Sequence, residues 1–508
     1  MFIRRKKNKS GSISIYLLKK EGRKQLLIKS FGSGKTEQEI LRLEDEAHKE
    51  IENISRQTQL DFDYKQDHQY LSFLKSNINH IRPIGAELIL NRIFDDIGFN
   101  QISDTLFRHL IISRVICPSS KLKTIDYLSR HHHIYYDVSK VYRYMDKLND
   151  SHKELLQKIS YEHTLGLFNG NLSVVFYDVT TLYFEASKED DLRKIGYSKD
   201  GKSHNPQIVL GLLVSKGGYP LAFEMHQGNK YEGHTFIPIL DKFKSTFELD
   251  NLIVIADSGL MSNSNIEQLK EKNYNFIIGA RIKNESLEIK KNILSYNWGI
   301  KIKVKEIDLD QQTRLIVSYS EKRAKKDANN REKGIERLKL KIKSGKLSKA
   351  NINNRGYNKF LKIEGQALVK LDLSKKDEDK KWDGLKGYVT NTDLSTSEVI
   401  ENYRELWQIE KAFRMSKTDL KVRPIYHRNS KRIESHLIIS FCSYKVYKEL
   451  ERLLKIKNID YSPEKAIDIL KSIYAMQTIL PVSKKNVEII MAKNFEQKEI
   501  LDAFDIKY

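Results

Sequence analysis

The stretch from Asn171 to Ala280 constrains the fold most, because its apolar runs predict strands and helices in a definite order. Its first run, Leu172–Val179, is a near-continuous series of β-branched and aromatic residues, as expected for a strand that is covered on both faces. The pattern that follows predicts the strands Pro206–Ser215 and Tyr219–His226, the helix Phe236–Phe247, the strand Leu252–Ala256, the helix Asn263–Glu271 and the strand Tyr274–Ala280. The predicted order is therefore βββαβαβ.

This order is that of ribonuclease-H-like folds, in which three antiparallel strands precede strands that alternate with helices. The turn Lys216-Gly217-Gly218 joins the second and third strands as a hairpin. After Arg281 the pattern breaks, and it returns with the strand Leu385–Asn391. We therefore expect an α/β fold with a ribonuclease-H-like mixed sheet, an insertion domain, and a helix after the last strand.

Other segments surround this core. Near the start, Ile13–Lys19 and Arg23–Phe31 predict a hairpin, and Thr36 with Glu39 predicts a capping box that begins a helix. Short helices rich in Arg and Lys follow; they suit DNA binding, but an ordinary helical bundle fits them equally well. The predicted domains are 1–62 (hairpin and helix), 63–168 (helical, DNA-binding), 169–284 (core, first part), 285–383 (insertion with the basic helix Glu321–Lys346), 384–455 (core, second part) and 456–508 (helical).

The net charge indicates a polyanionic partner. The 508 residues carry a formal charge of +22, which favours nucleic acid or an anionic membrane. The longest apolar runs, Leu252–Ala256 and Leu437–Ser440, are far too short to span a bilayer, and no signal-peptide pattern opens the chain. Cys117 and Cys442 lie in apolar helical contexts, which is typical of buried thiols in a reducing compartment. We expect a cytoplasmic protein that handles nucleic acid and has no membrane partner.

A helix predicted over Tyr403–Lys417 carries two stripes. One is apolar and consists of Leu406, Ile409, Phe413 and Leu420. The other combines an aromatic pair, a carboxylate and two cations: Tyr403, Trp407, Glu410, Arg414 and Lys417. This second stripe is either a solvated face, with Glu410 balanced by Lys417, or part of a functional site.

Two aspartates favour the functional interpretation. Asp178 and Asp257 end the first and fourth predicted strands, which lie next to each other in this fold. A carboxylate at the end of an apolar central strand is costly unless it is solvated, paired or metal-bound. Glu410, on the helix after the last strand, is the natural third member. Three carboxylates suit two Mg²⁺ ions, with Mn²⁺ as a substitute, about 3.5–4 Å apart in phosphodiester displacement.

In this interpretation Asp178 bridges both ions, and Asp257 and Glu410 each complete one. Arg414 and Lys417 would hold DNA phosphates. Trp407 and Tyr403 would stack on an unpaired base or support a phosphate, although core packing is an equally good account of Trp407.

These residues resemble a known family, the bacterial insertion-sequence transposases of the DDE type with the Y-x2-R-x3-E-x6-K signature. Tyr403, Glu410 and Lys417 stand at matching positions, and Asp178 in Tyr-Asp-Val-Thr-Thr and Asp257 in Ala-Asp-Ser-Gly look like the first two acids. The similarity covers about 171–454. One departure is Leu406, where the signature has arginine; the corresponding phosphate contact is either lost or supplied by Arg414.

The resemblance implies a cut-and-paste DNA transposase. Such an enzyme binds terminal inverted repeats, cuts a strand to free a 3′-hydroxyl, and joins that hydroxyl to target DNA without a covalent enzyme intermediate. Double-stranded DNA would be the partner, a homodimer would act on paired ends at the bacterial nucleoid, and no small-molecule cofactor would be needed. The alternatives are a ribonuclease-H-like nuclease without strand transfer and a catalytically silent DNA-binding protein derived from a transposase. Glycoside hydrolysis suits neither the charge nor the strand order.

Overall fold

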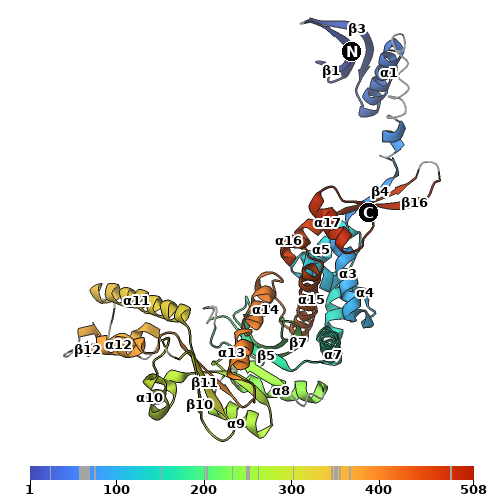
Figure 1. Cartoon of the computed structure of the whole chain (residues 1–508). Helices are drawn as coiled ribbons and strands as arrows, with labels where there is room; N and C mark the ends of the chain where they lie inside the picture. Colours follow the sequence, from blue (N-terminus) through green and yellow to red (C-terminus); the bar gives the residue numbers. More distant parts are fainter. Residues whose placement is uncertain are drawn as a thin grey trace. The chain divides into compact units, whose positions relative to one another are not determined.

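The chain forms two compact units in the computed structural model (Figure 1), Met1–Ile81 with Met476–Ile489, and Arg82–Ala475 with Ile490–Tyr508. The structure describes all residues except 23, 56–68, 74–75, 149, 199–200, 202–203, 232, 248–251, 261, 301, 345–346, 348–352, 354–355, 365–367 and 481–482. The predicted domain boundary at residue 62 and the end of the predicted basic helix, residues 345–346, lie outside the described residues. No helix in the described part of the chain has the length and apolarity needed to cross a membrane.

The first unit contains the predicted hairpin and helix. Its antiparallel sheet has the order β1-β2-β3, and α1 packs against β2 and β3. Thr36 and Glu39 form the predicted capping box, since each backbone N–H donates to the other side chain. The sheet and helix are β1 (Phe2–Lys7), β2 (Ile13–Glu21), β3 (Lys24–Gly34) and α1 (Glu37–Ser55). Strand β1 was not predicted, because four of its six residues are basic and hide the strand pattern.

A second sheet, in the order β16-β15-β4, contributes most of its residues to this unit. Its strands are β4 (Ile78–Pro83), β15 (Tyr474–Ile479) and β16 (Asn486–Met491). The sequence predicts only helices after residue 455. The helices α16 (Pro463–Lys471) and α17 (Phe495–Ala503) are present, but the polar hairpin between them lacks the apolar alternation that would have revealed it.

The second unit is built on an eight-stranded mixed sheet of order β10-β11-β14-β9-β8-β5-β6-β7. Strands β5 to β7 are antiparallel, and β8 and β9 continue parallel to β5 on its other side. This is the ribonuclease-H-like arrangement, and it confirms the predicted fold class. The elements are β5 (Val174–Tyr183), β6 (Gln207–Ser215), β7 (Pro220–Gln227), α8 (Gly233–Phe247), β8 (Ile253–Ala256), α9 (Asn263–Glu271) and β9 (Asn275–Ala280).

Both faces of this sheet are covered, so its central strands show no polar alternation. Phe176 and Leu182 of β5 belong to a core shared with α14 and α15, whereas Val175 and Val179 belong to a second core shared with α8 and α9. Residues at odd and even positions of β5 therefore face different layers. We call the side of Phe176 the α14 face.

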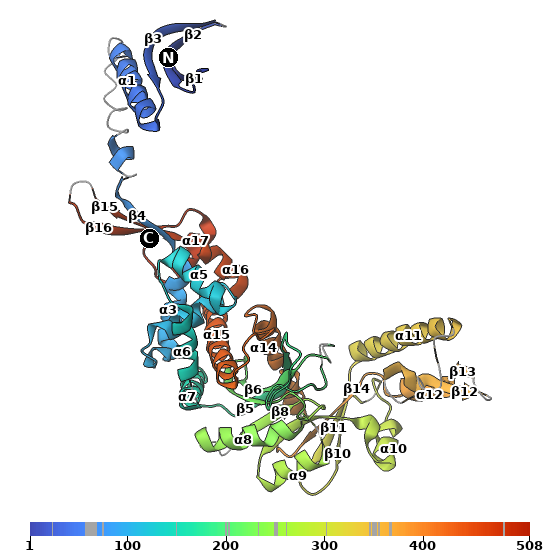
Figure 2. The ribbon, with the colours of Figure 1, turned by 180° about the vertical axis from the view of Figure 1, so that it is seen from behind.

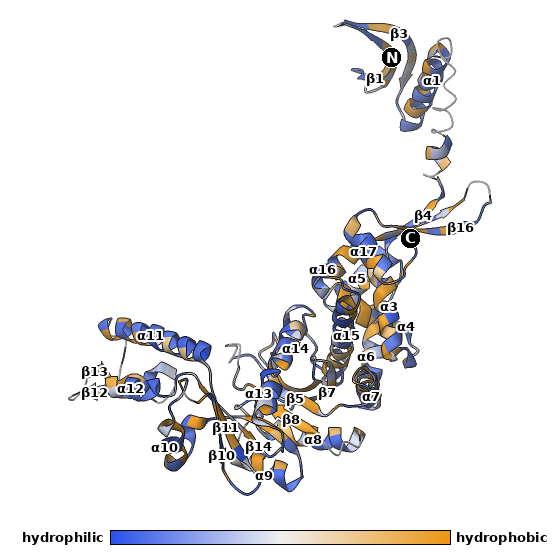
Figure 3. Ribbon diagram, viewed as in Figure 1, coloured by the Kyte–Doolittle hydropathy of each residue, from blue (hydrophilic) through white to orange (hydrophobic). Residues whose placement is uncertain are grey.

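Part of the predicted insertion, 285–383, extends the central sheet. Strand β11 (Arg314–Tyr319) pairs with both β10 (Val304–Asp308) and β14 (Leu385–Thr390). The rest of the insertion comprises α10 (Leu287–Ser295), α11 (Glu321–Lys343), β12 (Leu361–Glu364), β13 (Leu368–Leu371) and α12 (Leu373–Lys380). Hydrophilic residues dominate α11 (Figure 3), but Ile335 and Leu338 are buried in a small core with Phe360.

The predicted helical region packs around one long helix. Helix α15 (Ser430–Ile456) contacts α3, α4, α6 and α7 and also β7 of the sheet, as Figures 1 and 2 show from opposite sides. The surrounding helices are α3 (Gly85–Ile97), α4 (Thr105–Ile116), α5 (Lys121–His132), α6 (Val138–Lys147) and α7 (Asp150–Leu167). Cys442 on α15 is buried as predicted, whereas Cys117, just after α4, is exposed.

Lys445 on α15 gives this bundle a pH dependence. Its Nζ is buried and donates to the Ser160 carbonyl at 3.0 Å, and burial lowers its pKa to about 7. In the unfolded chain the same ammonium titrates near its ordinary value of about 10.4. Between these two values the unfolded chain binds more protons than the folded chain. The free energy of unfolding therefore rises with pH from about 7 to about 10.

We expect Lys445→Met to remove this rise, because methionine fills a similar space and binds no proton. Denaturant unfolding at about pH 7 and about pH 9.5 should show the wild type gaining on the order of 2 kcal/mol more than the variant between the two values. Lys158→Met, at an exposed lysine of α7, is the control and should keep the wild-type dependence. Equal pH dependence in Lys445→Met and the wild type would contradict this account.

Candidate active site

The two predicted aspartates lie side by side at one end of the sheet. Strands β5 and β8 are parallel, and their last register pair is Tyr177 with Ala256, so Asp178 and Asp257 each follow directly. Asp178 shares the α14 face with Phe176, two residues earlier. The Val179 N–H donates to Asp178 Oδ1 at 2.7 Å. The pairing of β5 with β8 thus joins two carboxylates that are 79 residues apart in the sequence.

The helix predicted over Tyr403–Lys417 is two helices. Helix α13 (Thr396–Arg404) begins with a capping box of Ser395 and Glu398, and α14 (Trp407–Thr418) follows after a turn. At the turn the N–H groups of Gln408 and Ile409 donate to the carbonyls three residues earlier, at 2.9 and 3.2 Å. No proline or glycine marks this break, so the sequence pattern gives no sign of it. Tyr403 and Glu410 consequently lie on different helices.

Tyr403 supports Asp257 from the interior. It is only 3% exposed, and its hydroxyl donates to Asp257 Oδ1 at 3.2 Å. Its ring packs edge-on against Tyr388 of β14, with 4.8 Å between centroids. Gly279 of β9 makes room for the phenol, since a Cβ there would overlap the hydroxyl. Burial, and then the charge of Asp257, raises the pKa of Tyr403, so the phenol stays protonated as a donor.

A lysine that the sequence analysis missed joins this group. Lys386 of β14 places its Nζ 4.3 Å from the centroid of the Tyr403 ring. Burial lowers its pKa, while the charges of Asp257 and Glu410 oppose that shift. Lys386 therefore lies within electrostatic range of both carboxylates, and it links Glu410 on α14 to Asp257 at the end of β8. A lone lysine inside the apolar run of β14 was the available signal.

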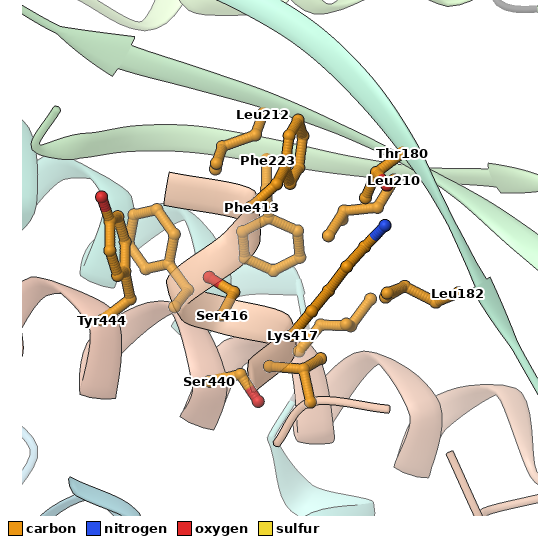
Figure 4. Close-up of a pocket in the computed structure, with 13 residues that line it drawn as sticks. Thr180, Leu182, Leu210, Leu212, Phe223, Phe413, Ser416, Lys417, Ser440 and Tyr444 are labelled. Atoms are coloured by element: carbon orange, nitrogen blue, oxygen red, sulfur yellow. The ribbon is translucent and has the colours of Figure 1, made fainter. Parts of the chain in front are cut away.

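The remaining predicted residues lie on α14. Glu410 and Arg414 are exposed, and Trp407 is 49% exposed. Lys417 lines a small cavity of about 40 Å³ between α14, α15 and the sheet. Figure 4 shows its side chain extending along this cavity toward Thr180 of β5, which shares the α14 face with Asp178. The ammonium of Lys417 thus points to the strand that carries the first aspartate.

The four predicted DNA contacts are placed differently. Trp407, Arg414 and Lys417 reach the surface or the cavity, whereas Tyr403 is interior. Leu406, at the position where the signature has arginine, is 7% exposed and packs in the core beneath α14. A phosphate contact from that position is therefore closed off, and exposed Arg414 is the available cation. DNA contact by each of the four stays a prediction.

The donor chemistry at this edge fits a hard divalent cation, because Asp178, Asp257 and Glu410 offer only carboxylate oxygens. Within the described part of the chain, however, no three His, Cys, Asp or Glu side chains are gathered closely enough to hold a metal ion. Asp178 and Asp257 follow paired strands at one end of the sheet, and Glu410 on α14 is in electrostatic range of Lys386, but the three do not form a set of ligands. Binding of an ion would require their side chains to move together.

The family model described as "Transposase DDE domain" matches residues 169–445, more than half of the chain. No curated protein matches the sequence. The piggyBac transposase in its synaptic complex with hairpin DNA has a TM-score of 0.36 and 11% identity, over 72% of this chain and 69% of its own.

Two structures of the Mos1 transposase are more distant. Its paired-end complex with the left transposon end has a TM-score of 0.16 and 12% identity, over 31% of this chain and 53% of its own. The Mos1 mariner complex with Mn has a TM-score of 0.15 and 15% identity, over 26% and 43%. At these TM-scores the assignment rests on the family match. The chain belongs to the transposase family that carries the DDE domain.

Proposed function

We propose that the chain is a cut-and-paste transposase of an insertion sequence, which binds terminal inverted repeats, cuts DNA and joins the freed end to a target. The observation that carries this proposal is the pairing of β5 with β8, which brings Asp178 and Asp257 to the same end of a ribonuclease-H-like sheet, with Lys386 in electrostatic range of both Asp257 and Glu410. Packing alone gives no reason for two acids so distant in sequence to leave the sheet side by side. A shared chemical task is the better explanation.

The proposed chemistry is phosphodiester displacement. Asp178, Asp257 and Glu410 would hold two Mg²⁺ ions, for which Mn²⁺ can substitute, and such ions activate the attacking oxygen and stabilise the leaving one. Tyr403 would keep the Asp257 carboxylate oriented through its hydrogen bond. Lys386 would offset part of the negative charge between Asp257 and Glu410. No side chain here needs to form a covalent bond to DNA.

Two successive displacements would cut the transferred strand and join it to the target. In the first, a water oxygen attacks a phosphorus at the transposon end, and a 3′-hydroxyl leaves. In the second, that hydroxyl attacks a phosphorus of the target strand and releases another 3′-hydroxyl, so one phosphodiester replaces another. Arg414 and Lys417 would hold the strand through its phosphates, and Trp407 would stack on a base. We further propose a homodimer on paired ends at the bacterial nucleoid.

Asp257→Asn should abolish Mg²⁺-dependent cleavage of DNA that carries the inverted repeats flanking the gene, while binding of that DNA is kept. The amide has nearly the same shape but lacks the negative charge and one oxygen ligand. Cleavage and binding are measured on the same labelled duplex. Asp308→Asn, at the exposed end of edge strand β10, is the matched control and should cleave normally. Full cleavage by Asp257→Asn would contradict the assignment of Asp257 to the site. If the wild type cuts the duplex but forms no joined products, the protein is a nuclease.

Tyr403→Phe should lower the cleavage rate about tenfold, because Asp257 loses a charge-assisted hydrogen bond worth about 1.5–3 kcal/mol. It should also raise the Mg²⁺ concentration for half-maximal cleavage, so that added Mg²⁺ partly restores the rate. Tyr388→Phe removes a hydroxyl from the neighbouring ring, which contacts Ser318 instead of a carboxylate. That control should leave the Mg²⁺ dependence unchanged. An identical Mg²⁺ titration for Tyr403→Phe and the wild type would remove Tyr403 from the site.

Lys417→Ala should weaken DNA binding to a similar degree for end-containing and unrelated duplexes. A contact to phosphate carries no base information, and its loss should reduce the slope of log affinity against log salt by about 1. The measurement is a salt titration of both duplexes. Lys158→Ala on α7 is the control for a lysine outside the α14 face. An unchanged slope with altered sequence preference would show that Lys417 reads bases.

A further inference from the structure

A cavity lined by basic residues lies apart from Asp178, Asp257 and Glu410. It is a cavity of about 550 Å³ in the second unit, bordered by the α4–α5 connection, by the segment Lys421–His427 after α14, and by α15. We call it the basic cavity. Its charged and aromatic lining includes Arg114, Lys121, Tyr142, Arg423, His427 and His436. None of the described residues that line it is acidic.

Two of its cations are buried without an acidic partner among the described residues. Arg114 is 4% exposed, and its Nη1 donates to the Leu420 carbonyl at 2.8 Å. Lys121 is 5% exposed. Burial lowers the pKa of Arg114 to about 10, and burial together with the charge of Arg114 lowers the pKa of Lys121 well below its ordinary value. A buried charge normally has a counter-charge; here no carboxylate opposes either shift.

Two imidazoles, His427 and His436, also line the cavity. His436 Nε2 donates to the Val422 carbonyl at 2.9 Å, and its Nδ1 is buried with no partner within the described structure. Burial, followed by the charges of Lys121 and Arg114, lowers the pKa of His427 to about 4. The charged groups that shift the pKa of either imidazole are all positive, and only the Val422 carbonyl opposes the shift in His436. The basic cavity is complementary to an anion that the protein itself does not supply.

The start of α5 adds donors to this site. Ser119, Ser120 and the first turn of α5 border the cavity, and Ser120 caps the helix by accepting from the Lys123 N–H at 3.4 Å. Free N–H groups at a helix N-terminus attract anions, phosphate among them. Together with buried Arg114 and Lys121, they form a site with cations, donors and room for one phosphate and its attached sugar.

We propose that the basic cavity binds a phosphate group of a DNA strand and so anchors the DNA beside the carboxylate site. This rests on the proposed function, in which the strand runs past Glu410 and Lys417. Lys421, at the cavity, follows Lys417 by four residues, which is at most about 14 Å of chain. Phosphates along one strand recur every 3.4 Å or so of the duplex axis. A strand held at Lys417 therefore has another phosphate within reach of the cavity. A free phosphate would offer the same chemistry from a different source.

The first test measures thermal unfolding of the full chain in sodium chloride and in inorganic phosphate at equal ionic strength. Phosphate should raise the melting temperature of the wild type by about 2 °C at roughly ten times its dissociation constant. Lys121→Gln should lose this gain. Without phosphate the variant should be at least as stable as the wild type, because an uncompensated buried charge is gone. Lys158→Gln on α7 is the control and should keep the full gain.

Lys421→Gln provides a second variant in case Lys121→Gln does not fold, since Lys421 lines the cavity but its side chain is exposed. It should lose at least half of the phosphate gain. If the wild type gains nothing from phosphate over chloride, or both variants gain as much as the wild type, the basic cavity is not a phosphate site.

The second test identifies the source of the phosphate. In duplexes carrying the inverted repeat, single phosphates are replaced by neutral methylphosphonates, one position at a time. At one or two positions the replacement should weaken wild-type binding about tenfold and should weaken Lys121→Gln binding no further. Identical methylphosphonate profiles in the two proteins, together with a phosphate-dependent melting gain, would assign the cavity to a free phosphate and overturn the DNA anchor.

Asp257→Asn separates this inference from the proposed function. That variant should keep the phosphate gain and the methylphosphonate profile while it fails to cleave. If the wild type neither binds nor cuts the DNA, the proposed function fails, and the thermal measurement still decides whether the basic cavity takes phosphate.

Discussion

The parallel pairing of β5 with β8 is the interaction on which the site depends. It fixes the register at Tyr177 and Ala256, so Asp178 and Asp257 leave the sheet at the same level. A shift of one residue would turn one carboxylate to the opposite face. The pairing is secured on both sides, because Phe176 and Ile255 pack toward α14 while Val175 and Val254 pack toward α8 and α9. The apolar core thus sets the positions of the two charged groups.

The third carboxylate depends on a weaker arrangement. Glu410 is carried by α14, which packs on β5 and β6 but begins at a turn without a side-chain cap. The contacts that tie this helix region to the aspartates are the hydrogen bond from Tyr403 to Asp257 and the position of Lys386 near both acids. The like charges of Asp257 and Glu410 repel each other, and half-buried Lys386, which is in electrostatic range of both, reduces that repulsion. Asp257 is thus held by the fold and a hydrogen bond, whereas Glu410 is held by helix packing and charge.

The sequence predicts those features that depend on the spacing of apolar residues and on the order of strands and helices along the chain. The strands of the core and the helical character of 63–168 come from apolar patterns, and Asp178 and Asp257 follow from where two apolar runs end. It does not predict what depends on tertiary contact. The break before Trp407 uses ordinary helix formers, β10 and β11 join the sheet only through pairing with β14, and Lys386 gains meaning only beside Asp257 and Glu410. Likewise, the sequence shows Arg114 and Lys121 only as residues of the predicted helical region, 63–168, and only the fold shows that both are buried around one cavity.

Charge explains why such a cavity would accompany the carboxylates. An edge with Asp178, Asp257 and Glu410 repels the phosphates of its proposed substrate, so the binding energy for DNA has to come from elsewhere. The net charge of +22 attracts DNA from a distance, but salt screens exposed charges beyond about 10 Å. Buried cations are screened less, and their desolvation cost is already met when the chain folds. Arg114 and Lys121 can therefore hold a phosphate at a fixed point, whereas surface lysines would give only diffuse attraction. The cavity that they line also includes Lys421, which follows Lys417 by four residues.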